Sequence, residues 1–275
     1  MVAGVGGSSF EAELARLVPM AEQVAPISTE ELRARVAKAQ ALMREQGIGA
    51  LYLDTSTNLA YFTGIGLKLT ERLHGAIIPA EGGIAYLSPA FEEPKTREYM
   101  RFGDDVRVWE EHEDPAALVI ETVRGMGHEG GTIAIDPATP FFTVDGLRRA
   151  GNSFGFTSAA TITEACRQVK SPAEIAIMQA ANDITLEVHK ATARALSVGV
   201  GTAEVKAFLD AAHRRLGGVP AGGAAQFGEA TAYPHGVPYE QVLRDGDMVL
   251  VDTGCTLHGY RSDITRTYVF GEPTP

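Results

Sequence analysis

The sequence lacks the features that would assign it to several large classes of protein. Its 275 residues include two cysteines, Cys166 and Cys255, which are far apart and cannot form a disulfide framework, so a reducing compartment is expected. Lys and Arg together number 24 against 35 Asp and Glu, giving a net charge of −11, and there is no basic block to neutralise a phosphate backbone. We therefore exclude a disulfide-stapled domain and expect no nucleic-acid partner.

Long apolar runs and common cofactor loops are also missing. The N-terminus has no Lys or Arg before Arg16 and no sustained apolar stretch, so it indicates neither a signal peptide nor a membrane anchor. We expect a cytoplasmic protein with no membrane contact. Ser153 and Ser158 lie near glycines without a Gly-x-Ser-x-Gly elbow, which gives serine hydrolase chemistry little support. Asp54 and Asp136 follow predicted strands without a glycine-rich phosphate loop, and we assign them to turns.

The composition is that of a globular chain. Apolar residues make up 45% and charged residues 21%, and the length favours two domains or one large one. Short strand candidates alternate with helical patterns, which predicts an α/β sheet covered by helices for a first domain over residues 28–165. The predicted strands are 48–53, 75–78, 84–87, 106–109 and 132–135, and the predicted helices are 93–101, 116–124 and 144–150.

A helix signal marks the start of this first domain. Ser28 and Glu31 have capping-box spacing before an amphipathic helix that Gly47 ends. Residues 1–27, which precede this helix, mix apolar and polar residues. They predict either a loosely held arm or a docking helix.

A second domain is predicted over residues 166–275. Ser171 as N-cap, Pro172 and Glu174 begin a long helix that runs to about Leu196, and a second helix follows from Thr202 to Leu216. A glycine-rich loop to Gly223 and then strands complete a predicted α+β arrangement. The apolar stripe expected for the long helix consists of Ile175, Met178, Ala181, Thr185, Val188 and Thr192.

Two aspartates are the strongest chemical signal. The apolar run Met248 to Val251 predicts a strand that is buried on both faces and leads directly into Asp252, and a hairpin centred near Leu257 would place Asp252 opposite Asp263. Opposed residues in such a pair have Cβ atoms about 5 Å apart. Two carboxylates this close require a shared proton or a cation, and oxygen ligands at this spacing suit two divalent metals. Alternatively, Asp252 caps a turn while Asp263 pairs with Arg261 or Arg266.

His235 is the second candidate. It lies between Pro234 and Gly236 in a loop that Pro238 further stiffens, where a neutral imidazole could donate to a substrate carbonyl or exchange a proton. An ordinary exposed loop histidine explains the same residues. For His189 and His213, which fall in predicted helices, packing or solvation is the simpler role.

Five segments in order resemble the proline-specific branch of the metallopeptidases with the pita-bread fold, which includes Xaa-Pro dipeptidases (prolidases) and Xaa-Pro aminopeptidases. The resemblance covers nearly all of the chain after residue 28. The segments are Asn58 to Gly64, Arg167 to Ile175, Pro234 to Gly236, Gly246 to Gly254 and Gly259 to Thr267.

The resemblance implies a fold, a reaction and a set of site residues. It implies a creatinase/prolidase-like N-terminal α/β domain followed by an α+β pita-bread catalytic domain. Asp252 and Asp263 would be metal ligands, and His235 would contact substrate near the scissile carbonyl as a catalytic residue. The cofactors would be two divalent ions, Mn²⁺ or Co²⁺ with Zn²⁺ as an alternative. The substrate would be a proline-containing peptide, and the protein a homodimer.

The same resemblance implies that part of the site lies elsewhere. The family completes its ligand set with a histidine and two glutamates further along, so we expect only the first half of the catalytic domain in these 275 residues, and an inactive chain on its own. The alternative is a family member that is not a peptidase: a creatinase-like hydrolase, a metal-dependent lyase of a small molecule, or a binding module.

Overall fold

A computed structural model describes residues 4–273, which form two compact units. One unit comprises residues 27–170, and the other combines the N-terminal residues up to Pro26 with the residues from Ser171 onward. Within the described range no helix has the length and apolar character needed to cross a bilayer.

The 27–170 unit is built on a six-stranded mixed sheet with the order β4-β3-β2-β1-β5-β6. β1 pairs in parallel with β5 and in antiparallel with β2, so the predicted α/β sheet is present. The sixth strand, β6, was not predicted. The strands are β1 (Ile48–Asp54), β2 (Gly75–Pro79), β3 (Ala85–Pro89), β4 (Val106–Trp109), β5 (Gly131–Ile135) and β6 (Phe154–Ser158).

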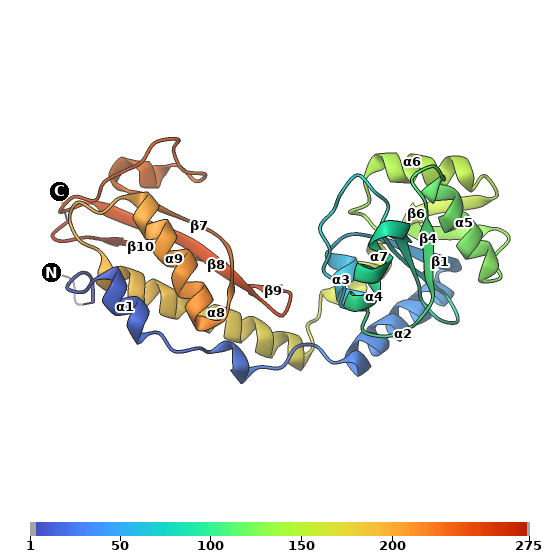
Figure 1. Cartoon of the computed structure of the whole chain (residues 1–275), viewed down its shortest axis with the longest axis horizontal. Helices are drawn as coiled ribbons and strands as arrows, with labels where there is room; N and C mark the ends of the chain where they lie inside the picture. Colours follow the sequence, from blue (N-terminus) through green and yellow to red (C-terminus); the bar gives the residue numbers. More distant parts are fainter. Residues whose placement is uncertain (1–3, 274–275) are drawn as a thin grey trace. The chain divides into compact units, whose positions relative to one another are not determined.

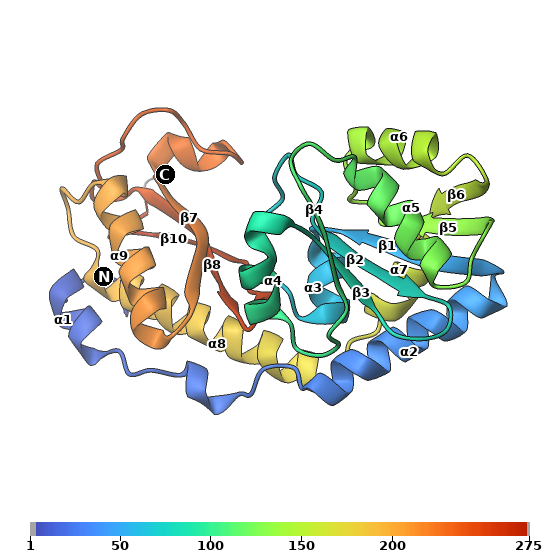
Figure 2. The ribbon, with the colours of Figure 1, turned by 45° about the vertical axis from the view of Figure 1, so that its right-hand side comes forward.

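Helices cover both faces of this sheet because successive strand residues point to opposite sides. Leu51 and Leu53 of β1 belong to the core beneath α2, α3 and α7, whereas Ala50 and Tyr52 belong to the core beneath α5 and α6. Figure 2 shows α2 on one side of the sheet and α5 and α6 on the other. The helices are α2 (Thr29–Glu45), α3 (Thr57–Thr63), α4 (Glu93–Tyr99), α5 (Pro115–Gly125), α6 (Phe141–Ala150) and α7 (Ala160–Arg167), with a 3-10 turn at Ala90–Glu92.

The segment Asn58 to Gly64 forms α3, a helix that the sequence did not predict. Its residues hold the end of α7: the Asn58 Oδ1 accepts a hydrogen bond from Arg167 at 2.7 Å, and the Tyr61 hydroxyl donates to the carbonyl of Cys166 at 2.8 Å. Gly64 ends α3 with a left-handed φ of 79°. This segment therefore fixes the part of the unit that leads to residue 170.

The other unit has a smaller antiparallel sheet with the order β10-β8-β7, and a short strand β9 that also pairs with β8. α8 and α9 pack against one face of it (Figure 1). β7 was predicted as a glycine-rich loop, which is wrong. The elements are α1 (Phe10–Arg16), α8 (Pro172–Ala195), α9 (Thr202–Leu216), β7 (Val219–Phe227), β8 (Met248–Leu257), β9 (Tyr260–Arg261) and β10 (Ile264–Val269), with 3-10 turns at Ala21–Gln23 and Gly228–Ala232.

The start of α8 follows the sequence, and most of the predicted stripe is buried: Ala181, Thr185, Val188 and Thr192 are all inaccessible to solvent. Ser171 and Glu174 form the predicted capping box. Ile175, expected on the apolar stripe, is 56% exposed, and Ile177 is fully buried instead. The prediction is therefore wrong only near the start of the helix, at Ile175 and at the half-buried Met178.

The N-terminal segment packs on α8 and α9. Glu13 of α1 is fully buried and pairs with Arg194 of α8 at 2.7 Å and with Arg16 at 2.6 Å. The rings of Phe10 and Phe208 lie 4.8 Å apart between their centroids. Of the two alternatives for this segment, the structure has a docked helix.

Candidate metal-binding face of the small sheet

Strand β8 carries Asp252 on the sheet face that α8 and α9 leave uncovered. Val249 and Val251 are fully buried, whereas Leu250 and Asp252, each one residue further along, are only half-buried, so the predicted burial of both strand faces is wrong. The alternation follows from the two-residue period of a strand with one face on a helical core. Asp252 is therefore accessible from the open side, although its strand is largely buried.

The partner of Asp252 across the hairpin is Thr265, so the predicted pairing with Asp263 is wrong. The turn lies at His258 and Gly259, which have positive φ values of 47° and 86°. A two-residue turn of this kind matches the twist of the strands, and it is centred one residue later than we predicted. Each residue of β8 therefore pairs with a residue that lies two positions further along the chain than the predicted partner.

The corrected register keeps the two aspartates close together along the hairpin. Asp263 lies opposite Gly254, which is two residues from Asp252 along β8, so the aspartates are diagonal neighbours rather than a direct pair. Diagonal neighbours remain within reach of long side chains or of a shared ion. The Thr265 hydroxyl donates to Asp252 Oδ1 at 2.6 Å and orients that carboxylate.

The alternative in which an arginine neutralises Asp263 finds no support. Arg261 donates to the carbonyl of Ala221 at 3.2 Å, and Arg266 donates to the carbonyl of Thr265 at 2.9 Å. In the part of the chain that the structure describes, neither forms an ion pair with Asp263, whose side chain is exposed. Its carboxylate is therefore available to a ligand.

His235 lies in an exposed turn after β7. The buried side chain of Gln226 fixes this turn, because its Nε2 donates to the carbonyls of Ala230 at 2.5 Å and Tyr233 at 2.9 Å. The amide of Gly236 donates to the carbonyl of Tyr233 at 3.0 Å. No contact in residues 4–273 joins the imidazole of His235 to either aspartate, so the structure places the histidine in the same unit without bringing it onto them.

Comparison with known families shows two adjacent matches. The creatinase/prolidase N-terminal domain matches residues 35–169, and metallopeptidase family M24 matches residues 176–275. Together the two matches include both aspartates, His235 and the whole six-stranded sheet. The chain carries this M24 match in its second unit, and we call it the M24 chain for that match. The creatinase/prolidase-like domain followed by a pita-bread domain, expected from the resemblance, is confirmed.

Relatives of this M24 chain include an uncharacterized peptidase of Schizosaccharomyces pombe, 30% identical over 90% of this chain and 57% of its own length. A putative dipeptidase of Bacillus subtilis is 28% identical over 88% of this chain and 67% of its own. Among solved structures, the dipeptidase PepE of Mycobacterium ulcerans is 28% identical with a TM-score of 0.79, covering 91% of this chain and 68% of that one. The M24 chain thus spans about 57% to 68% of the length of these relatives.

The chemistry of the two aspartates fits a metal ion, but the described residues form no complete metal site. Asp252 and Asp263 offer hard carboxylate oxygens of the kind that divalent Mn²⁺ accepts. Among residues 4–273, however, no group of three or more His, Cys, Asp or Glu side chains comes together in a way that could hold a metal ion. The two aspartates fit as members of a ligand set and do not make a complete one.

Two residues near the aspartates were not predicted to act there. Thr265 orients Asp252, and His189 of α8 donates from Nε2 to the carbonyl of Ile264 at 2.9 Å, directly after Asp263. Burial lowers the pKa of His189, and within the described residues its Nδ1 is buried without a hydrogen-bond partner. The sequence showed His189 only as a helical histidine, because the strand it contacts is 75 residues away.

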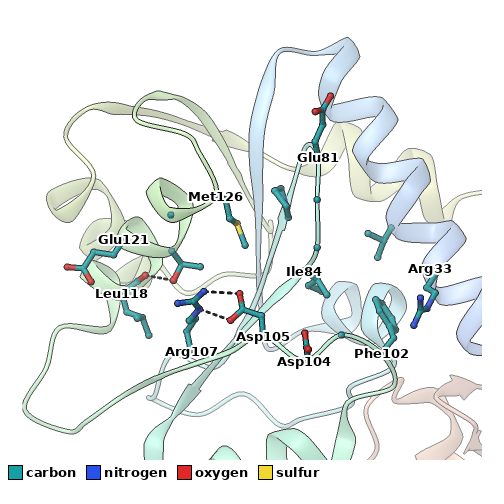
Figure 3. Close-up of a pocket in the computed structure, with 17 residues that line it drawn as sticks. Arg33, Glu81, Ile84, Phe102, Asp104, Asp105, Arg107, Leu118, Glu121 and Met126 are labelled. Atoms are coloured by element: carbon teal, nitrogen blue, oxygen red, sulfur yellow. Dashed lines mark hydrogen bonds and ion pairs between the residues drawn. The ribbon is translucent and has the colours of Figure 1, made fainter.

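A cavity of about 710 Å³ lies entirely in the 27–170 unit (Figure 3). Acidic groups line it, including Glu81, Asp104 and Glu121, and its Arg107 is already paired with Asp105 at 2.6 Å. None of the residues predicted to act in catalysis lines this cavity. We therefore do not assign it to the M24 site.

Proposed function

We propose that this chain provides the first metal ligands and a substrate-contacting histidine of a metal-dependent peptidase that cleaves the bond preceding proline. The observation that carries the proposal is the pair Asp252 and Asp263 on the open face of the β8–β10 hairpin, inside the M24 match. The names of the relatives, among them dipeptidases, support a peptidase. Because the chain spans only part of their length, the activity is proposed for the full-length protein that contains this sequence.

In this proposal each residue has a distinct task. Asp252, held by Thr265, and the exposed Asp263 contribute carboxylate oxygens to a pair of divalent ions, Mn²⁺ or Co²⁺ with Zn²⁺ as an alternative. Such ions supply Lewis acidity when bound. His235 contacts the substrate near the carbonyl that is attacked. Its imidazole is available for this contact because it is exposed on a fixed turn and forms no hydrogen bond among the described residues.

The division of the chain is part of the proposal. Residues 28–165 would be the creatinase/prolidase-like domain and residues 166–275 the beginning of the catalytic domain. The homodimer and the cytoplasmic location also stay predictions.

The test compares three substrates with the full-length protein after treatment with EDTA and after addition of Mn²⁺ or Co²⁺. Ala-Pro represents a dipeptide, Ala-Pro-Ala a longer peptide with the same bond, and Ala-Ala a dipeptide without proline. We expect metal-dependent release of alanine from one or both proline peptides and at least about tenfold less from Ala-Ala, a difference of about 1.4 kcal/mol. Equal turnover of Ala-Ala would contradict the proline specificity, and no turnover with any metal would contradict the peptidase.

A further inference from the structure

The hydrogen-bond ladder of the β8 hairpin is interrupted at the residue before Asp263. The pairs Thr256–Arg261 and Thr253–Ile264 lie on either side of the interruption and share one register, so no residue has been inserted. At the interruption the Cys255 amide donates to the hydroxyl of Ser262 at 3.0 Å. A serine side chain thus replaces a backbone carbonyl as the acceptor.

The displaced carbonyl of Ser262 occupies the space that a side chain at position 254 would need. A Cβ built on Gly254 would overlap the carbonyl oxygen of Ser262 and lie 3.3 Å from the Cα of Asp263. Glycine at 254 is therefore a requirement of this backbone path. The path takes Asp263 out of the regular ladder, so the position of its carboxylate depends on how Ser262 is held.

A chain of buried side chains holds Ser262. Its hydroxyl lies 2.7 Å from the Thr185 hydroxyl on α8, which lies 3.3 Å from His213 Nε2 on α9. His213 Nδ1 donates to the carbonyl of Leu209 at 2.9 Å, so Nε2 of the neutral ring is the acceptor. Thr185 then donates to His213 and accepts from Ser262, whose hydroxyl also lies 3.3 Å from the Cys255 carbonyl as a second, longer acceptor. A lone pair of Ser262 remains for the Cys255 amide.

This chain is sealed from solvent. Thr185, His213 and Cys255 are fully buried and Ser262 is 3% exposed. Burial also lowers the pKa of His213, which keeps its ring neutral. Because a buried donor or acceptor that loses its partner cannot turn to water, each member of the chain must keep a protein partner.

We propose that Thr185 is a positioning residue for Asp263, acting through the hydroxyl of Ser262 and oriented by His213. The inference rests on the proposed role of Asp263 as a metal ligand. It adds that residues of α8 and α9, the two helices packed on the sheet, support the position of this ligand. Second-sphere partners of a ligand commonly change metal affinity by about 10- to 100-fold, which sets the expected size of the effect.

The experiment replaces Thr185 and a matched threonine of the same helix in the full-length protein. Thr192 is also fully buried, but its hydroxyl donates to the carbonyl of Val188 within α8 at 2.8 Å. Thr185→Val and Thr192→Val therefore each remove one buried threonine hydroxyl. Only the hydroxyl of Thr185 contacts Ser262. Thr185→Ser keeps the hydroxyl.

The first readout is amide hydrogen exchange at Cys255, which needs no metal. We expect at least about tenfold faster exchange in Thr185→Val than in Thr192→Val, because the Ser262 hydroxyl is no longer held for this amide. The second readout is the Kd for Mn²⁺, which should rise about tenfold or more in Thr185→Val and stay within about twofold of the unsubstituted protein in Thr185→Ser and Thr192→Val.

The two readouts separate this inference from the proposed function. Unchanged exchange at Cys255 in Thr185→Val, or an equal change in Thr192→Val, would overturn the positioning role. An unchanged Mn²⁺ Kd in Thr185→Val would overturn it as well, provided that Asp263→Asn weakens Mn²⁺ binding. If Asp263→Asn leaves Mn²⁺ binding unaltered, the metal-ligand role itself is wrong, and with it the inference.

Discussion

Each unit of the molecule places two aspartates on neighbouring strands, but only one of the pairs is open. Asp54 ends β1 and Asp136 follows the adjacent parallel strand β5, and both are 1% exposed. Asp252 is half-buried with a hydrogen bond from one threonine, and Asp263 is exposed. Two carboxylates on adjacent strands are therefore not a site in themselves, and access to their oxygens distinguishes the pairs.

The closed pair is saturated by protein donors. Asp136 accepts from the side chains of Ser56 and Asn58 and from the amide of Ala138. Asp54 accepts from the Thr55 amide at 2.7 Å, and its burial raises its pKa to about 6. Asp136 fastens the end of β5 to the start of α3, whereas Asp54 is held at the end of its own strand by Tyr52 and Thr55. Both carboxylates are closed to solvent. The sequence assignment of Asp136 to a turn agrees with its bond to the Ala138 amide.

Both units use the same glycine contact beside an aspartate. Gly75 lies opposite Asp54, and a Cβ there would overlap the carbonyl oxygen of Leu53, as a Cβ on Gly254 would overlap that of Ser262. In each case the residue before the aspartate turns its carbonyl toward the glycine. The local backbone is thus alike, and the surroundings decide whether the acid is structural or accessible.

The largest expected effect comes from exchanging one acid in each pair. Asp263→Asn in the full-length protein should lower kcat/KM for Ala-Pro by at least about 1000-fold, or about 4 kcal/mol, because a ligand charge is lost. Asp54→Asn should leave kcat/KM within about twofold. Steady-state kinetics at saturating Mn²⁺ measures both values. A loss of activity in Asp54→Asn alone would mean that the closed pair, and not the open pair, takes part in catalysis.

Asp54→Asn should instead change stability in a pH-dependent way. The raised pKa means that the folded state binds a proton more tightly than the unfolded state, so stability falls as pH rises from about 4 to 6. Asparagine removes this cost. We expect the variant to be up to about 3 kcal/mol more stable at pH 8 and equally stable at pH 4. Urea unfolding at both pH values tests this, and a constant difference would exclude titration of Asp54 as the cause.

His235→Ala should affect activity without affecting stability. The imidazole is exposed and makes no hydrogen bond in the described residues, so its removal should leave the Tm within about 1 °C. If His235 contacts the reacting carbonyl, kcat/KM should fall about 100-fold. His112→Ala, an exposed histidine of the other unit, is the matched control. Equal kinetics in the two variants would remove His235 from the site.

The two glycine contacts should give the smallest and most similar effects. Gly75→Ala and Gly254→Ala should each destabilise the protein by about 1–3 kcal/mol, because the new Cβ meets a backbone carbonyl. Gly83→Ala, where no atom lies within 4 Å of the added Cβ, should be neutral. Thermal unfolding compares all three. Only Gly254→Ala should also weaken Mn²⁺ binding, and an equal loss in Gly75→Ala would contradict the division of roles.

Much of the fold could be predicted because local signals agreed with the final structure. Ser28, Ser171 and Pro172 mark helix starts where α2 and α8 begin. β7 could not be predicted, since Pro220, Gly222 and Gly223 disfavour a strand and only pairing with β8 stabilises it. A bulge between Pro220 and Gly223 accommodates these residues.

The sequence supplied the candidate residues of the site but not their geometry. Asp252 was visible because an acid directly after a buried strand is unusual, and Asp263 because a hairpin would bring it back beside Asp252. Their relation was misjudged by two residues because His258, a residue other than glycine, adopts the left-handed φ of the turn. Thr185 and His213 could not be connected with Asp263, since the contacts that join them span three elements distant in sequence.

The most direct test of the account is Mn²⁺ binding measured by isothermal titration calorimetry on the full-length protein and on its Asp263→Asn and Asp54→Asn variants. We expect at least about tenfold weaker binding in Asp263→Asn and an unchanged Kd in Asp54→Asn. Equal Kd values in all three proteins, or a loss confined to Asp54→Asn, would contradict the claim that the open face of the small sheet is the metal-binding face.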